Sequence, residues 1–247
     1  MTLRFHEIAE SRHRILNPLS AEKLSLIGQI CTAAGPTRLL DLCCGKAEML
    51  STWAAEHNVS GIGVDISEVF LAAARQRAVE LGVDDRVTLV QADATTYVTE
   101  VAEQFDVVSC IGATWIGNGL VGTLELMRPR VKPGGLIAVG EPYWIDPLPE
   151  GKSVPGIADE DYVSLARTHE RCQEAGFDLA EMVLSNTDDW DRYVASQWST
   201  VDDWLRQNPD DPDADALDEW IRAGQRSYLS VDRRYLGWGV FVLRPQR

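Results

Sequence analysis

The 247-residue sequence has little basic charge and no long apolar run. It holds 23 Lys and Arg against 38 Asp and Glu, for a formal net charge of −15. Proteins that bind nucleic acid neutralise phosphates with clustered basic residues, so this balance argues against a nucleic-acid partner. No apolar stretch approaches the roughly 18 residues that span a bilayer, so we expect no membrane partner. A small molecule remains as the expected ligand.

Cysteine is also sparse, and its pattern predicts no metal site. The five cysteines form an odd set without a Cys-x-x-Cys pair. No charged and then apolar leader precedes them, so we expect free thiols in a reducing, cytoplasmic environment. Adjacent Cys43 and Cys44 invite a metal or a nucleophile, but no third Cys or His lies at ligand spacing, which favours simple packing.

Repeats and low-complexity linkers are absent too, while 45% hydrophobic residues suffice for a core. One domain over residues 1–247 is therefore predicted. Strands and helices alternate up to residue 141, as in a doubly wound, mostly parallel α/β sheet. The predicted strands are 38–42, 60–64, 86–90, 104–110 and 134–140. The predicted helices are 20–34, 48–57, 67–81, 94–102 and 118–128.

The alternation changes after residue 141, where prolines predict an irregular segment. A helix over 159–175 and a strand over 177–185 follow, and a last strand is predicted over 237–243. The last two strands are then separated by a helical insertion, residues 186–236. Residues 1–36 hold a polar arm and a helix, and the arm is either a surface segment or a helical lid over the site.

The stretch from Arg38 to Glu48, RLLDLCCGKAE, is the most informative one. An apolar strand ends near Asp41, and small residues then turn the chain into a helix, an arrangement that places backbone N–H groups around a ligand. The next strand ends at Asp65, where an acid accepts hydrogen bonds from ribose hydroxyls. Asp93 follows the third strand and can accept from the amine of an adenine. These acids predict a nucleoside site.

Five segments between residues 37 and 141 resemble motifs of one family. They are LLDLCCGKA, GVDIS, QADA, FDVVSCIGATW and VKPGGLIAVGE. They resemble, in order, the motifs of class I S-adenosylmethionine-dependent methyltransferases. The resemblance implies S-adenosyl-L-methionine as cofactor and a Rossmann-like, seven-stranded doubly wound sheet whose last strand is antiparallel. Residues 37–141 would form the cofactor-binding core.

The same resemblance assigns the expected cofactor contacts. Asp41 would lie near the amino acid end of the cofactor, Asp65 on the ribose, and Asp93 with Ala94 on the adenine. The full expected set is Asp41, Cys43, Gly45, Asp65, Ile66, Asp93, Ala94 and Ile111. Cys43 and Ala47 depart from the family, which usually has glycine at these positions of the loop.

Nearly the whole chain also resembles a group of bacterial small-molecule methyltransferases of poorly defined substrate. The matching segments include His13-Arg14-Ile15, Gly112 to Ile116, Gly140 to Trp144, Trp190 to Tyr193 and Gly237 to Phe241. A methyltransferase acting on a small molecule is therefore the leading hypothesis. Two alternatives remain: the altered loop admits another cofactor or donor chemistry, or the protein is a non-catalytic regulator that binds an adenosyl ligand.

Side chains after the fourth and fifth strands are the candidates for catalysis, because ligands bind at the carboxyl ends of parallel strands. We expect Glu141 or His13 to remove or orient the substrate proton, with Tyr143 as a hydrogen-bonding partner. Trp115 is expected to shape the acceptor pocket. The aromatic residues from Trp190 to Trp204 fit either core packing of the insertion or a cap over that pocket.

Overall fold

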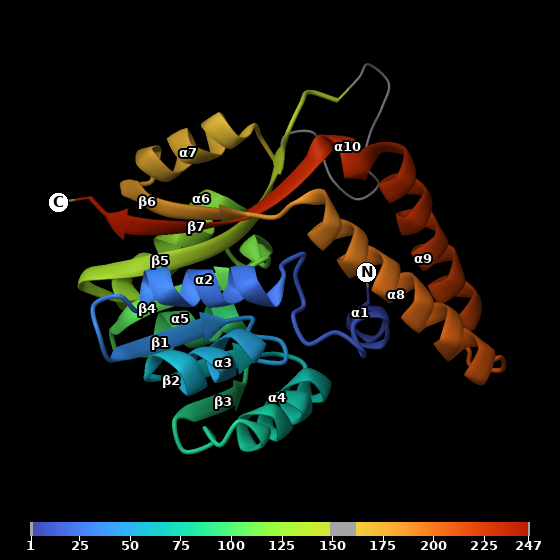
Figure 1. The fold of residues 1–247 in the computed structure, drawn as a ribbon, viewed down its shortest axis with the longest axis horizontal. Coiled ribbons are helices and arrows are strands. Elements are labelled where there is room, and N and C mark those ends of the chain that lie inside the picture. Colours follow the sequence, from blue (N-terminus) through green and yellow to red (C-terminus); the bar gives the residue numbers. More distant parts are fainter. Residues whose placement is uncertain (1, 149–161, 247) are drawn as a thin grey trace.

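The computed structural model describes residues 2–148 and 162–246, in which a central sheet carries helices on both faces (Figure 1). The seven strands lie in the order β3-β2-β1-β4-β5-β7-β6. They are β1 Thr37–Leu42, β2 Val59–Asp65, β3 Val87–Gln91, β4 Phe105–Ile111, β5 Val131–Trp144, β6 Phe177–Leu184 and β7 Leu236–Pro245. The strands from β3 to β5 run parallel, and β7 runs antiparallel between β5 and β6. The predicted Rossmann-like sheet with an antiparallel last strand is confirmed.

The α-helices follow the predicted order. They are α1 Leu3–Ala9, α2 Ala21–Cys31, α3 Glu48–His57, α4 Glu68–Glu80, α5 Ala94–Glu100, α6 Leu120–Met127, α7 Leu165–Glu174, α8 Thr187–Gln207, α9 Ala214–Ser227 and α10 Arg233–Tyr235. Three short turns of other helix types are η1 Thr114–Gly117, η2 Arg128–Arg130 and η3 Tyr228–Asp232. No helix among the described residues has the length and apolarity needed to cross a membrane.

Most predicted boundaries agree with these elements to within a few residues, and the largest difference concerns α7. The predicted helix 159–175 begins at Leu165, because Ser164 caps it by accepting the N–H of Arg167. Residues 159–161 lie outside the described residues. β5 begins at Val131, earlier than the predicted strand 134–140, and its pairing with β4 is irregular. Val131 already pairs with Phe105, and the register shifts before Val107.

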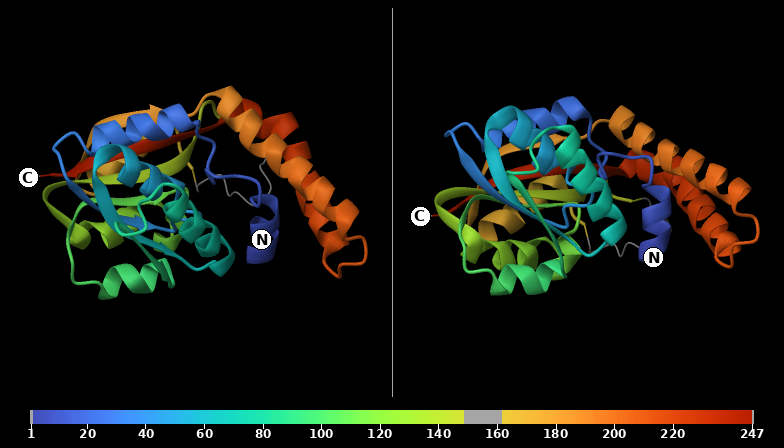
Figure 2. Two further views of the ribbon diagram at one scale, coloured as in Figure 1. Left: turned by 60° about the horizontal axis from the view of Figure 1, so that its bottom comes forward. Right: turned by 90° about the horizontal axis from the view of Figure 1, so that it is seen from below.

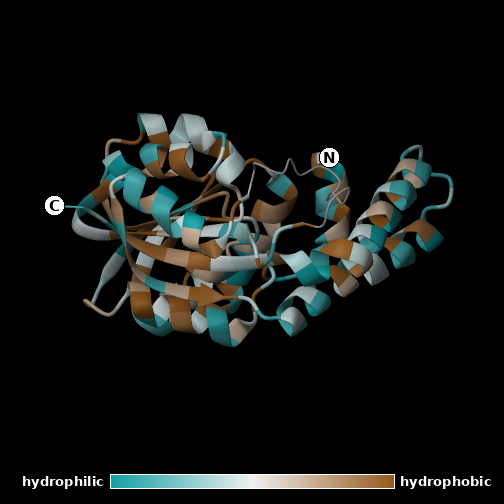
Figure 3. Ribbon diagram, turned by 90° about the horizontal axis from the view of Figure 1, so that it is seen from above, coloured by the Kyte–Doolittle hydropathy of each residue, from teal (hydrophilic) through white to brown (hydrophobic). Residues whose placement is uncertain are grey.

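Two apolar layers hold the helices on the sheet. One layer joins side chains of α2, α3 and α4 to the strands, and the other joins α5, α6 and α7 to the opposite face. The strands are accordingly brown and the helices mixed in Figure 3. Because strands covered on both faces read as continuous apolar runs, the parallel arrangement was readable from the sequence.

Helices α8 and α9 lie side by side and project beyond the sheet, with α1 packed against α8 (Figure 2). Ala9 of α1 is fully buried in a third apolar cluster with Val201 and Leu217. Arg4 donates to Asp211 in the loop that connects α8 to α9. The N-terminal segment is thus a helix docked on the insertion rather than a loose surface arm.

Two helical glycines provide a test of the packing of α2. A Cβ at Gly28 would lie 2.7 Å from the indole nitrogen of Trp53, whose ring is 1% exposed and donates to Leu24 O. A Cβ at Gly224 in α9 would meet no atom within 4 Å. We expect Gly28→Ala to lower the free energy of unfolding by about 1–3 kcal/mol through overpacking. Gly224→Ala should raise it by about 0.5–1 kcal/mol through helix propensity. Urea denaturation measures both, and equal signs would contradict the packing argument.

Candidate functional site

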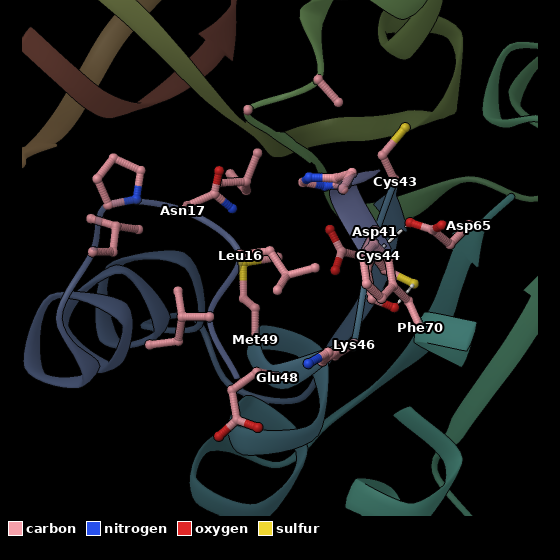
Figure 4. Close-up of a pocket in the computed structure, with 18 of the residues that line it drawn as sticks. Leu16, Asn17, Asp41, Cys43, Cys44, Lys46, Glu48, Met49, Asp65 and Phe70 are labelled. Atoms are coloured by element: carbon pink, nitrogen blue, oxygen red, sulfur yellow. Dashed lines mark hydrogen bonds between the residues drawn. The ribbon is translucent and has the colours of Figure 1, made fainter. Parts of the chain in front are cut away.

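A cavity of about 510 Å³ opens at the carboxyl ends of the parallel strands. Its walls come from the ends of β1, β2 and β4, from the segment after α1, and from α8. Figure 4 shows Asp41, Cys44 and Asp65 gathered on one side of it, with Leu16 and Asn17 of the N-terminal segment across from them. Its volume is that of a typical small-ligand site.

The loop after β1 has a left-handed backbone at every second residue. The φ angles are +55° at Cys43, +54° at Gly45 and +48° at Ala47. A left-handed conformation costs a residue with a Cβ about 1–2 kcal/mol, which glycine avoids. Cys43 and Ala47 therefore adopt, at a cost in strain, a conformation that glycine adopts without it. Strained backbone of this kind is concentrated at ligand sites.

The carboxylate of Asp65 fixes this loop to the end of β2. One of its oxygens accepts the N–H of Gly45 at 2.8 Å, and the other accepts the N–H of Ser67 at 2.8 Å. Ser67 in turn caps α4 and donates to Glu7 at 2.6 Å. Asp65 thus holds the loop after β1, the start of α4 and, through Ser67, α1 in one arrangement.

Asp41 is a buried acid in the cavity wall, with 3% of its surface exposed. Burial raises the pKa of Asp41 to about 7, the hydroxyl of Ser109 opposes the rise from 2.7 Å, and the charge of Asp65 adds to it. Its charge at neutral pH is therefore finely balanced. A cation bound in the cavity would favour the ionised form.

The third strand-end acid, Asp93, caps α5 by accepting the N–H of Thr96 at 2.8 Å. The backbone N–H of Thr96 holds the pKa of Asp93 below its ordinary value, so Asp93 is ionised. Ile66, Ala94 and Ile111 line the same cavity and add apolar surface. A carboxylate acceptor beside apolar side chains suits a heteroaromatic ring that bears an amine.

The cysteines of the loop pack against neighbouring groups. The thiol of Cys43 contacts that of buried Cys110 and, together with burial, raises the pKa of Cys110. Burial likewise raises the pKa of Cys44. Thiols of this kind are poor nucleophiles. In the described ranges, no three His, Cys, Asp or Glu side chains are grouped so that they could hold a metal.

Lys46 joins the N-terminal segment to the loop. Its ammonium donates to the carbonyl oxygens of Glu10, Ser11 and His13 at 2.8, 2.8 and 2.6 Å. Leu16 then lies so close to Gly45 that a Cβ there would be 2.6 Å from a Leu16 methyl group. The segment forms one wall of the cavity, which agrees with the lid rather than the surface-arm alternative.

Glu10 is a fully buried carboxylate that connects this segment to α8. It accepts from the hydroxyl of Tyr193 and from the amide of Gln197, both at 2.6 Å, and its other oxygen lies 2.9 Å from Nδ1 of His13. Burial raises its pKa, but the contacts with His13 and Tyr193 outweigh burial and leave the pKa below its ordinary value. His13 is engaged here and does not line the cavity.

The cavity brings together nine of the twelve predicted site residues. They are the eight expected cofactor contacts, Asp41, Cys43, Gly45, Asp65, Ile66, Asp93, Ala94 and Ile111, and the 70% exposed Trp115. Glu141 and Tyr143 do not line it, because strand residues alternate and Pro142 between them is the one that faces the cavity. The roles of all twelve stay predictions.

Glu141 instead lies behind the cavity wall, where it contacts Thr114, a residue that the sequence analysis did not single out. Its carboxylate, 4% exposed, accepts the hydroxyl of Thr114 at 2.6 Å. Burial raises the pKa of Glu141 to about 7, although the Thr114 hydroxyl and the charge of Arg171 oppose the rise. Thr114 itself lines the cavity. The position of Thr114 shortly after a strand and next to Trp115 is the feature of the sequence that could have marked it as a site residue.

Helix α8 supplies one wall of the cavity with the aromatic side chains of Trp190 and Tyr193 and the amide of Gln197. Trp204, near the other end of α8, packs in the cluster around Ala9, in line with the core-packing alternative for the insertion. The indole N–H of Trp190 is buried and has no hydrogen-bond partner among the described residues. Glu10 and Lys46 also escaped prediction, because a lone acid and a lone lysine carry no pattern.

Comparison with known proteins places these features in a family. Residues 39–135 match a family model described as a methyltransferase domain. The chain is 41% identical to the uncharacterized protein YjhP of Escherichia coli, over 97% of both chains. It is 29% identical to a ubiquinone biosynthesis O-methyltransferase of an Azoarcus species, over 68% of this chain and 73% of the relative. A crystal structure of a SAM-dependent methyltransferase from Geobacter sulfurreducens, in complex with S-adenosyl-L-homocysteine, is 42% identical, covers 99% of both chains and superposes with a TM-score of 0.89.

The raised pKa of Asp41 predicts a pH-dependent stability. The folded state binds this proton more tightly than the unfolded chain, so its stabilising contribution is complete below about pH 4 and is lost as the pH rises through about 7. Asp41→Asn removes this dependence. Between pH 5 and pH 8, we expect the free energy of unfolding of the variant to rise by about 2 kcal/mol relative to that of the wild type. Urea denaturation at the two pH values measures this difference.

Asp106→Asn is the matched control. Burial raises the pKa of Asp106, but the N–H of Arg38 and the ammonium of Lys132 outweigh burial and lower it. Its contribution is therefore already complete at pH 5, so the loss in this variant should be the same at pH 5 and pH 8. A constant difference for Asp41→Asn as well would disprove the raised pKa.

Proposed function

This chain belongs to the S-adenosylmethionine-dependent methyltransferases, and we propose that it transfers a methyl group to a small molecule held between the strand ends and α8. S-adenosyl-L-methionine supplies a methyl group already activated by its sulfonium charge. The observation that carries the proposal is the convergence of Asp41, Asp65 and Asp93 on one cavity. The related Geobacter protein, crystallised with S-adenosyl-L-homocysteine, supports this cofactor.

The residues present fit the cofactor. Asp65 keeps acceptor capacity for ribose hydroxyls, because each of its oxygens takes only one backbone N–H. Asp93 and the apolar side chains beside it suit the adenine. Asp41 suits the positively charged amino acid end, where a nearby cation would favour its carboxylate. The acidic balance of the chain suits a cationic cofactor as well.

The acceptor half of the cavity is aromatic. Its lining includes Trp115, Tyr162, Trp190, Tyr193, Trp220 and Trp238. Such walls exclude water and hold an apolar acceptor in line with the methyl group, which is the main task left to the protein. The Azoarcus relative is an O-methyltransferase, which supports an oxygen acceptor.

Among the predicted catalytic residues, Trp115 keeps its proposed role in shaping the acceptor pocket. His13 and Tyr143 would act only by supporting the cavity walls, since neither residue lines the cavity. The alternative cofactor and the non-catalytic regulator are less well supported. The loop keeps its left-handed geometry despite Cys43 and Ala47, and the relatives named above include methyltransferases.

Calorimetry with S-adenosyl-L-methionine and S-adenosyl-L-homocysteine tests this function. We expect both to bind, and Asp65→Asn to weaken both by about tenfold or more, because an amide replaces a charged acceptor. Asp85→Asn, at an 83% exposed side chain outside the cavity, is the control and should bind like wild type. Absence of binding by the wild-type protein would refute the proposal, and unchanged binding by Asp65→Asn would refute the role of Asp65.

A further inference from the structure

Glu141 contacts Thr114, a residue of the cavity wall, through a side-chain hydrogen bond. The carboxyl is 4% exposed and Thr114 is 8% exposed. Oγ1 of Thr114 donates to Oε2 of Glu141 at 2.6 Å, a short distance typical of a hydroxyl on a carboxylate. Thr114 lines the cavity, whereas Glu141 does not. A buried acid is costly unless it is paired or used, so this contact needs an explanation.

The other groups that face Glu141 do not explain why a buried acid is placed against Thr114. From α7, the charge of Arg171 lowers the pKa of Glu141, and Cys172 has its own pKa raised by burial and by the charge of Glu141. Tyr143 lies on the same face of β5, and burial raises its pKa. The carbonyl of Thr114 is held separately by the hydroxyl of Thr123 at 2.7 Å, so η1 is already anchored without Glu141.

We propose that Thr114 and Glu141 form a proton relay for an acceptor that reacts through a phenolic or enolic O–H group. The inference rests on the proposed function and adds the class of its substrate. A threonine hydroxyl has one proton and two lone pairs. Because its proton is committed to Glu141, the hydroxyl can offer the cavity only a lone pair. A group that binds to it there must donate a hydrogen bond.

The proton and electron changes balance within this arrangement. The acceptor O–H bond breaks as its proton moves to Oγ1 of Thr114, and the original Thr114 proton moves to Oε2 of Glu141. The electron pair freed on the acceptor oxygen forms the bond to the methyl carbon, and the pair of the broken methyl–sulfur bond stays on sulfur. One positive charge, on sulfur, and one negative charge, on Glu141, disappear together. Thr114 touches the acceptor, and Glu141 acts through it.

An oxygen acceptor is the chemistry that needs such a relay. A neutral amine or a thiolate attacks without prior loss of a proton, whereas a neutral hydroxyl gains nucleophilicity when its proton is removed. The pKa of Glu141, raised to about 7, suits a base that works at neutral pH. The aromatic walls suit a flat acceptor.

The test combines kinetics and binding in the full-length protein. Formation of S-adenosyl-L-homocysteine is followed with a panel of hydroxybenzoates and catechols at pH 5–9. In the wild type, kcat/KM should fall below about pH 7, where Glu141 becomes protonated. Glu141→Gln and Thr114→Val should each lower kcat by about 10²–10³-fold and remove this limb of the profile. The double variant should lose no more than either single one.

Two control variants and two further measurements separate a relay from a structural contact. Thr114→Ser keeps the hydroxyl and should retain the pH profile. Thr200→Val removes another buried hydroxyl, one that donates to Ser196 O within α8, and should leave the rate unchanged. Calorimetry should give every variant a dissociation constant for S-adenosyl-L-homocysteine within about threefold of wild type. Infrared difference spectra against Glu141→Gln should show a carboxyl that titrates near pH 7 and shifts in Thr114→Val.

Each other result decides against the relay. Unchanged rates and pH profiles in Glu141→Gln or Thr114→Val, or losses that multiply in the double variant, would overturn it. If S-adenosyl-L-homocysteine binds but no phenol in the panel is methylated, the phenolic assignment fails and the methyltransferase function stands. If the wild-type protein binds no adenosyl compound, the proposed function fails and the inference fails with it.

Discussion

The hydrogen bond from the N–H of Gly45 to the carboxylate of Asp65 is the constraint on which the site depends. It joins the ends of two parallel strands, and it holds a loop that has a left-handed backbone at three alternate residues. Without an external partner, such a loop would relax, since Cys43 and Ala47 prefer other conformations. The other oxygen of Asp65 fixes Ser67 at the start of α4, so one carboxylate positions both the loop after β1 and the start of α4 at the cavity.

The N-terminal segment depends on the same loop. Lys46 belongs to the loop and gathers three carbonyl oxygens of the segment, while Glu10 of that segment gathers Tyr193 and Gln197 of α8. The cavity wall is therefore one hydrogen-bonded chain from the sheet to the insertion. Residues far apart in sequence share the cavity because a lysine and a buried glutamate connect their elements, in addition to the apolar packing of α1 on the insertion.

The shared position of Asp41, Asp65 and Asp93 could be predicted from the sequence, because the parallel register brings the ends of these strands to one edge whatever the details of packing. The sequence could not show which face of β5 carries the side chain of Glu141. β5 is buried on both faces, so its residues show no polar alternation that would mark which side meets the cavity. Pro142 faces the cavity and Glu141 does not. The contact of Glu141 with Thr114, 27 residues away, is a tertiary fact that no local pattern encodes.

In the proposed mechanism, the two buried acids have different tasks despite similar pKa values of about 7. Asp41 lines the cavity directly, so a bound cation acts on it at short range and favours its charged form. Glu141 is buried and does not line the cavity, so in the proposed relay the cation affects it less and its proton is exchanged through the hydroxyl of Thr114. One acid is thereby suited to stay charged in the complex, and the other to change charge during the reaction. This division follows from which side of β5 and of β1 each acid occupies, and it accounts for the presence of two costly buried carboxyls in one site.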